Sequence, residues 1–241
     1  MNKKISLNMN QLKLIAMMLM LIDHFAYMMI ELGVGVSGNW YLIDRIMRGM
    51  GRAAFPIFCF TIVEGFQRTK DAGAYLKRLI LFALISEIPF DLAFRRSLVD
   101  FSFQNVFWTL AFGLFAMMLY ENREISPWKR MFGLLVCFWV PQMVHTDYSM
   151  YGVLTMFLMY LFRKEPIKAG LAGYIVLLLQ NPGEKWAIFG FLLILLYNGR
   201  RGNGNKYIYY LFYPAHLLLL VFLKPYIVSF LSGVFAATMV I

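Results

Sequence analysis

The sequence predicts an all-α membrane protein: a polytopic transmembrane helical bundle of about eight to ten spans with a cytoplasmic N-terminus. Of its 241 residues, 61% are hydrophobic and 15% are charged, whereas soluble domains are about half apolar and about a quarter charged. The apolar residues form separate runs, and short segments rich in Lys and Arg connect these runs. No stretch is left over for a soluble module, so residues 1–241 are expected to form one integral membrane domain.

The basic residues decide the expected orientation. Most of the 23 Lys and Arg residues fall in alternate connecting segments, and these segments face the cytoplasm if the N-terminus is inside. The same alternation places Arg45, Arg48 and Arg52 outside, at spacings that put them on one helix face. The net charge of +10 therefore indicates membrane topology and not nucleic-acid binding, and the lipid bilayer is the expected large partner.

The first half of the chain is expected to contain four helical spans. Residues 12–29 form the first apolar segment, which ends in a glycine-rich loop. Residues 53–66 form the second, and a strongly basic loop follows it. Residues 79–94 form the third, in which Pro89 should distort the helix. Residues 105–120 form the fourth and lead into another basic loop.

The second half continues the same alternation of apolar segments and short connections. The expected spans are residues 131–144, 151–162, 169–180, 186–197 and 207–223. Residues 225–241 could be a further span or a continuation of the last one. Several of these segments are shorter than the roughly 20 residues of a straight crossing, so tilted or re-entrant helices are expected.

The first apolar segment carries the strongest functional signal. It contains Asp23 and His24, and ionisable residues at membrane depth are costly and by default mark a functional site. Lys13 precedes His24 by eleven positions, which puts both on nearly the same helix face, about 16 Å apart. A ligand with an anionic head and a long thin arm could contact both. The alternative is that Lys13 is an interfacial anchor and His24 a hydrogen-bonded core residue.

Polar residues of other apolar segments are further candidates. Glu64 and Glu87 are acids within spans, and Asn105 opens a span. Tyr213 and His216 lie on one face of a later span, and they and Asn105 are candidates for contacts with the substrate or the oxyanion. For each of these residues a purely structural hydrogen bond or ion pair is the alternative, and Arg68, one turn beyond Glu64, could pair with it.

No metal site is expected. The three histidines are scattered along the chain, and no His-x-x-x-His pattern occurs. The two cysteines, Cys59 and Cys137, lie in separate apolar segments without metal-ligand spacing.

Several blocks of the sequence resemble the TraX family. They are LKLIAMMLMLIDHFAY, GRAAFPIFCFTIVEGFQRTKDAGAYLKRLILFALISEIPFDLAF, NVFWTL, DYSMYGVLTMFLMYLF and YYLFYPAHLLLL, and they cover most of the chain in order. The family consists of multi-pass bacterial membrane proteins, and members from conjugative plasmids are linked to N-terminal acetylation of pilin. Its fold is similar to that of membrane acyltransferases that acetylate surface sugars. The resemblance therefore implies a bacterial cytoplasmic membrane protein that takes acetyl-CoA as co-substrate and a protein or glycan as acceptor.

Two elements of those acyltransferases have matches here. On their first helix, a basic residue precedes the catalytic His by ten intervening residues, and Lys13 and His24 fit this spacing with Lys in place of the commoner Arg. Their Arg-x-x-Arg element for acyl-CoA matches Arg45 and Arg48, in the stripe that ends at Arg52. The charge alternation places this stripe outside, whereas acyl-CoA is cytoplasmic.

The resemblance implies that His24 is a general base and that Lys13 and the arginines bind the co-substrate. Asp23 is rotated by about 100° from His24 on the same helix, so it is expected to anchor the helix. A carboxylate of another helix, Glu64 or Glu87, is then expected to orient His24.

Two alternative functions remain from the sequence. One is a proton-coupled transporter that uses the acids within the spans. The other is a non-catalytic assembly factor for a pilus or another envelope structure.

Overall fold

The computed structural model describes residues 6–36 and 38–238. In this part of the chain the structure is helical, and its β contacts are limited to two isolated bridges, Leu7 with Tyr197 and Gln104 with Thr146. The elements in chain order are α1 (Met9–Phe25), the π-helix η1 (Ala26–Val34), α2 (Asn39–Arg52), α3 (Ala54–Arg68), α4 (Ala72–Phe94), α5 (Val106–Glu121), α6 (Pro127–Met143), α7 (Ser149–Leu161), α8 (Pro166–Gln180), the 3₁₀ helix η2 (Pro182–Ala187), α9 (Ile188–Ile194) and α10 (Lys206–Thr238).

The expected all-helical fold class is confirmed. Within the described residues, three helical stretches are long and apolar enough to cross a membrane: residues 9–34, 40–68 and 207–233. At the C-terminus the structure agrees with one of the two expected alternatives, because residues 225–238 continue the helix of residues 207–223, with Pro214 and Pro225 inside it. Residues 239–241 of the last expected span lie outside the described residues. The number of spans stays a prediction.

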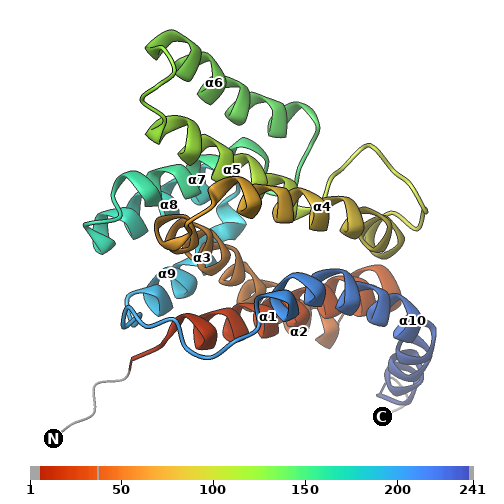
Figure 1. Cartoon of the computed structure of the whole chain (residues 1–241). Coiled ribbons are helices and arrows are strands. Elements are labelled where there is room, and N and C mark those ends of the chain that lie inside the picture. The colour runs from red at the N-terminus through yellow and green to blue at the C-terminus, as the bar shows by residue number, and fades with distance from the viewer. Residues whose placement is uncertain (1–5, 37, 239–241) are drawn as a thin grey trace, which may run out of the picture.

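α3 is central in the arrangement. It packs against α1, α5, α7 and α9, while α1 also packs against α2 and α10. Figure 1 shows α1, α2 (both red to orange) and the first part of α10 (blue) along one side, with α5 and α6 on the opposite side and α4 between them, packed against α10 and α5. The C-terminal part of α10 bends away from the line of its first part, and Val228 there packs beside Gly33 of η1. The shared region of α1, α2, α3 and α10 is where the site lies.

Contacts between loops agree with the alternation of sides predicted from charge. At the end predicted to be inside, the Met9 and Asn10 amides donate hydrogen bonds to the carbonyls of Arg200 and Arg201. At the opposite end, the loop residue Gln104 pairs with the turn after α6, and Arg96 donates to the Leu32 carbonyl. Each of these contacts joins segments assigned to the same side.

Local sequence explains how α1 begins and where it changes geometry. Asn8 and Gln11 form a capping box, in which each side chain accepts a hydrogen bond from the backbone N–H of the other residue. After Phe25 the chain widens into π-helical geometry, which is rare and often occurs at functional sites. The widened segment directly follows Asp23 and His24 and brings Glu31 beside α2.

The crossing of α1 and α2 depends on a glycine. A Cβ added at Gly51 would lie 2.2 Å from the Cβ of Asp23, so a side chain does not fit there without moving one helix. We expect Gly51→Ala to lower the free energy of unfolding by about 1–3 kcal/mol, as overpacked sites do. Thermal unfolding in detergent measures this change. The matched control is Gly233→Ala in α10, where no heavy atom lies within 4 Å, and equal stability of both variants would contradict the prediction.

Candidate functional site

The site is built around the carboxylate of Asp23 on α1. Arg48 and Arg52 are one helical turn apart on α2, and both reach this carboxylate. A nitrogen of each guanidinium lies 2.8 Å from one of the two Asp23 oxygens, and Asp23 is only 7% exposed. Arg48 also approaches Glu31 at 3.6 Å. Asp23 therefore connects α1 to α2, as an anchoring role requires.

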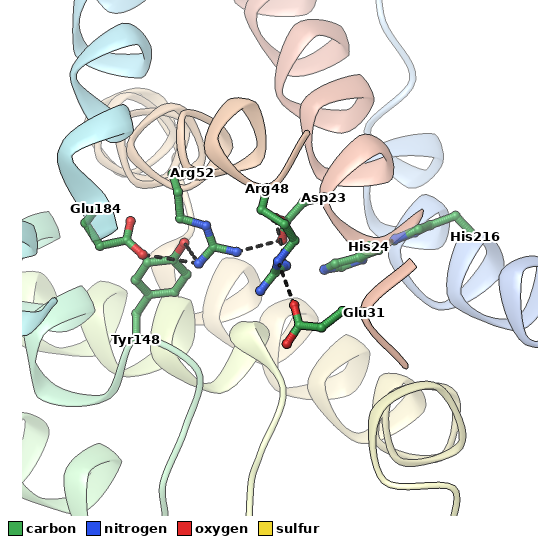
Figure 2. A network of polar contacts seen from close by, with 8 residues as sticks. All are labelled: Asp23, His24, Glu31, Arg48, Arg52, Tyr148, Glu184 and His216. Atoms are coloured by element: carbon green, nitrogen blue, oxygen red, sulfur yellow. Dashed lines mark hydrogen bonds and ion pairs between the residues drawn. The ribbon is translucent and has the colours of Figure 1, made fainter. Parts of the chain in front are cut away.

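Arg52 continues the cluster toward two loop residues. Its guanidinium donates to Glu184 at 3.1 Å and lies 3.5 Å from the hydroxyl of Tyr148. Figure 2 shows Arg52 between these two groups on one side and Asp23 on the other. Glu184 is 4% exposed, so little water reaches its carboxylate, and the guanidinium of Arg52 stabilises the negative charge instead.

The turn that carries Tyr148 has an uncommon backbone. His145, Tyr148 and Ser149 all have positive φ angles, of 52°, 61° and 45°. Such conformations are costly for these residue types and persist only where surrounding contacts impose them. Here Thr109 of α5 donates to the carbonyl of Asp147 and is 2.8 Å from the Thr146 hydroxyl. The strained turn places Tyr148 against Arg52, with its ring stacked on Phe55 at 3.6 Å.

Two carboxyl groups of these loops have altered acidity. Burial raises the pKa of Asp147 to about 6, and the nearby Arg52 guanidinium opposes the shift. Burial also raises the pKa of Glu184, again against the effect of Arg52. The Asp147 carboxyl can therefore exchange a proton close to neutral pH.

His24 lies next to this cluster and pairs with another helix. Its Nδ1 is 2.7 Å from Nε2 of His216 on α10, which itself is 4% exposed. The edges of Phe94 and Tyr213 contact the His24 ring, with centroids 5.2 and 6.0 Å away. Figure 2 shows His24 between His216 and the guanidinium of Arg48.

A cavity of about 270 Å³ opens beside His24. One wall is polar and contains Asp23, Arg48, Arg52 and Asp147. The other wall is aromatic and is lined by Tyr27, Phe90, Phe94 and Phe103. A cavity of about 280 Å³ adjoins it through Arg48 and Arg52 and is also lined by Arg45, Asn181 and residues 183–186.

Two smaller cavities lie between His24 and Lys13. One, of about 70 Å³, shares Asp23, His24, Arg52 and Asp147 with the cavity beside His24. The other, of about 90 Å³, is lined by Lys13. These two cavities share four wall residues, listed as Met20, Phe58, Val106 and Tyr213. The cavities therefore follow one another from Lys13 to His24 and on to the arginines.

Lys13 lies at the end of this series where the basic loop 198–205 runs. Its ammonium is 4.8 Å from the centre of the Tyr209 ring. Arg200 and Arg201 are exposed and are held beside α1 by the backbone hydrogen bonds of Met9 and Asn10. Lys13 and the stripe from Arg45 to Arg52 are thus at opposite ends of α1.

The expectation that Glu64 or Glu87 orients His24 is wrong. Glu64 accepts from Arg68 at 2.9 Å and from the Tyr197 hydroxyl at 3.3 Å, which confirms the pairing expected for Arg68. Both acids have local partners on their own or adjacent elements, and the imidazole of His216 occupies the place expected for a carboxylate.

Glu87 and Asn105 form a separate structural contact. The Asn105 side chain donates to Glu87 at 2.7 Å and to the Ala83 carbonyl at 2.8 Å, and Trp108 donates to Glu87 at 2.6 Å. Asn105 also caps α5 by accepting from the Phe107 amide. All of these contacts with Glu87 are made by one of its oxygens, Oε1, and they hold Asn105 in the α4–α5 connection instead of at His24.

The structure brings together six of the residues singled out in the sequence, at or beside the cavities that His24 lines. They are Asp23, His24, Arg48, Arg52, Tyr213 and His216. Sequence reasoning missed Asp147, Tyr148 and Glu184 as members of the site. They lie in short turns, and no helical spacing links them to α1 or α2. Among the described residues, no group of three or more His, Cys, Asp and Glu is arranged to hold a metal ion.

These features together define a helical membrane protein with a polar site buried between its helices. The chain belongs to the TraX family, because the family described as "TraX protein" matches residues 8–224. It is similar to the probable fimbrial assembly protein FimC, serogroup H1, of Dichelobacter nodosus, with 30% identity over 253 positions that cover 94% of this chain and 100% of that protein. No solved structure matches the chain. The resemblance to the TraX family seen in the sequence is confirmed.

Proposed function

We propose that this protein is a membrane acetyltransferase that moves an acetyl group from cytoplasmic acetyl-CoA to an amine or hydroxyl acceptor, with His24 as general base. The observation that carries the proposal is the series of cavities from Lys13 to His24 and on to the outer turns. A donor that enters at one end and an acceptor that enters at the other would meet at His24. The proposal places the chain in the bacterial cytoplasmic membrane with several crossings.

At the inner end, Lys13 and the exposed Arg200 and Arg201 supply cations for the phosphates of CoA. The pantetheine arm would extend along α1 toward His24, over the roughly 16 Å that eleven helical residues span. Arg48 and Arg52 are less suited to these phosphates, because Asp23, Glu31 and Glu184 already balance their charges. We therefore assign the arginines to the reaction centre and the acceptor side.

The reaction would take place at the cavity beside His24. His24 removes the proton from the acceptor amine or hydroxyl as its nitrogen or oxygen attacks the thioester carbonyl. The carbon–sulfur bond then breaks, and the proton passes from the imidazolium to the departing sulfur to give CoA. Guanidinium groups next to this position can stabilise the negative charge that develops on the carbonyl oxygen.

A substitution that fills the passage tests this proposal. Val106 lines both small cavities between Lys13 and His24, so Val106→Trp should obstruct them. We expect membranes containing this variant to incorporate label from radioactive acetyl-CoA at least about 100-fold more slowly than wild type, because the thioester no longer reaches the base.

Val136→Trp is the matched control, since Val136 is 36% exposed on α6. It should retain wild-type labelling. Titration of the purified proteins with acetyl-CoA follows binding separately. Equal labelling by both tryptophan variants, or wild-type protein that neither binds acetyl-CoA nor transfers label, would contradict the proposal.

The name of the D. nodosus relative favours a second candidate, a non-catalytic role in fimbrial assembly. In that case the variants His24→Ala and Lys13→Ala would still support normal assembly of surface fibres. Under the acetyltransferase proposal, the same variants lose acceptor modification while the protein remains in the membrane.

A further inference from the structure

We infer that His216 is a positioning residue that fixes His24 in the one tautomer able to act as a base toward the cavity. This inference rests on the proposed acetyl transfer for its functional part. Its structural part, the position of the proton on His24, stands on hydrogen-bond geometry alone.

The hydrogen bonds of His216 determine which of its nitrogens carries hydrogen. Its Nδ1 is 2.7 Å from the carbonyl oxygen of Phe212, one turn earlier on α10. A carbonyl oxygen can only accept, so Nδ1 of His216 must be the donor. In a neutral imidazole the other nitrogen, Nε2, is then an acceptor.

The surroundings of His216 keep it neutral. It is 4% exposed, and in the part of the chain that the structure describes no carboxylate is paired with it. Its immediate neighbours are the rings of His24, Phe212 and Tyr213. A positive charge in such a place would be costly without a partner.

The contact between the two imidazoles then fixes the proton on His24. The ring planes differ by 8°, and Nδ1 of His24 lies 2.7 Å from Nε2 of His216. Parallel faces cannot stack at this distance, so the rings meet edge to edge through a hydrogen bond. Since Nε2 of His216 accepts, Nδ1 of His24 must carry the proton.

The consequence is that the second ring nitrogen of His24, Nε2, keeps a lone pair that can accept a proton. With its hydrogen on Nδ1, His24 keeps Nε2 unprotonated, and its ring lies between His216 and the arginine cluster (Figure 2). Its side chain lines the cavity beside Asp23 and Arg52. When His24 takes a proton, the same contact continues to hold the ring, as second partners do for metal-bound histidines. The first and the last long helix thus build the base together.

Nitrogen NMR of protein labelled at histidine tests the proton position directly. In the wild-type protein, both His24 and His216 should carry their proton on Nδ1. The signals are assigned by comparison with His145→Asn and His216→Gln, each of which removes the signals of one histidine. In His216→Leu the nitrogen chemical shifts of His24 should move toward those of the tautomer protonated on Nε2, or of a mixture of the two tautomers. A wild-type His24 that carries its proton on Nε2 overturns the inference, whether or not the protein transfers acetyl groups.

Kinetics tests the functional part. We expect His216→Leu to lower kcat for label transfer from acetyl-CoA by about 10- to 100-fold with little change in KM, as losses of such second partners do. His216→Gln should recover most of this loss, because its amide oxygen can accept from Nδ1 of His24 and its amide nitrogen can donate to Phe212. An equal decrease of kcat in both variants, or an increase of KM with unchanged kcat, would indicate a merely structural role. Wild-type membranes that transfer no label refute the acetyltransferase proposal, and the NMR result then still decides the tautomer.

Discussion

Replacing His24 by alanine is expected to lower the rate of acetyl transfer by about 10²- to 10⁴-fold, the range that general bases contribute. The physical reason is that, among the described residues that line the cavity, His24 is the one imidazole, and both nitrogens of His216 are already within hydrogen-bond distance of other groups. The measurement is incorporation of label from radioactive acetyl-CoA into membranes of the expressing strain. Binding of acetyl-CoA to the purified variant should remain close to that of wild type, because Lys13 and the basic loop are unchanged.

His145 provides the matched control for this prediction. It is exposed on the turn between α6 and α7, with a φ of 52°. Asparagine tolerates this conformation better than most residues, so His145→Asn should fold and label normally. If His24→Ala retains wild-type labelling, His24 is not the base and the mechanism must be abandoned.

The substitution Arg52→Leu is expected to lower the free energy of unfolding by about 3–5 kcal/mol, the usual loss when one member of a buried ion pair is removed. Asp23 would keep Arg48 as a partner, but Glu184 would lose its only paired cation among the described contacts. Its carboxylate would then be left in a site where it is 4% exposed. Unfolding in mixed micelles with increasing denaturant provides the measurement.

The double variant Arg52→Leu with Glu184→Leu shows whether this reason is correct. It should recover part of the lost stability, because the charge left without a partner is removed as well. Arg200→Leu, at an exposed loop position, should change stability by less than about 0.5 kcal/mol. A double variant that is less stable than Arg52→Leu alone would show that packing, and not the unpaired charge, dominates at this site.

Sequence reasoning identified the members of the site best where their spacing follows the repeat of an α-helix. Lys13 and His24 share a face because they belong to one helix, and the arginine stripe of α2 follows from spacings of three and four. The position of Asp23 and His24 inside an apolar span indicated a functional site, because charged and polar groups are costly at that depth of a membrane. The same reasoning placed the basic loops on one side, and the loop contacts in the structure agree with that grouping.

The partners of those residues were predicted less well. A carboxylate was expected next to His24, whereas the structure has His216, 192 residues later in the chain. Both Glu64 and Glu87 were attractive because they are acids inside apolar segments, but Glu64 pairs with Arg68 and Glu87 accepts hydrogen bonds from Asn105 and Trp108. Polarity at membrane depth shows that a partner is needed and does not show which one.

The sequence by itself determined the helical membrane class, the helix that carries Asp23 and His24, and the face on which Lys13 and His24 lie. These properties depend on composition and on the helical repeat, and both are local. Only the tertiary structure decided that α10 supplies the neighbour of His24 and that two loop turns supply Tyr148 and Glu184 to Arg52. The rotation and register of packed helices depend on the close fit of many side chains at once, and on gaps such as that at Gly51, which no spacing along the chain encodes.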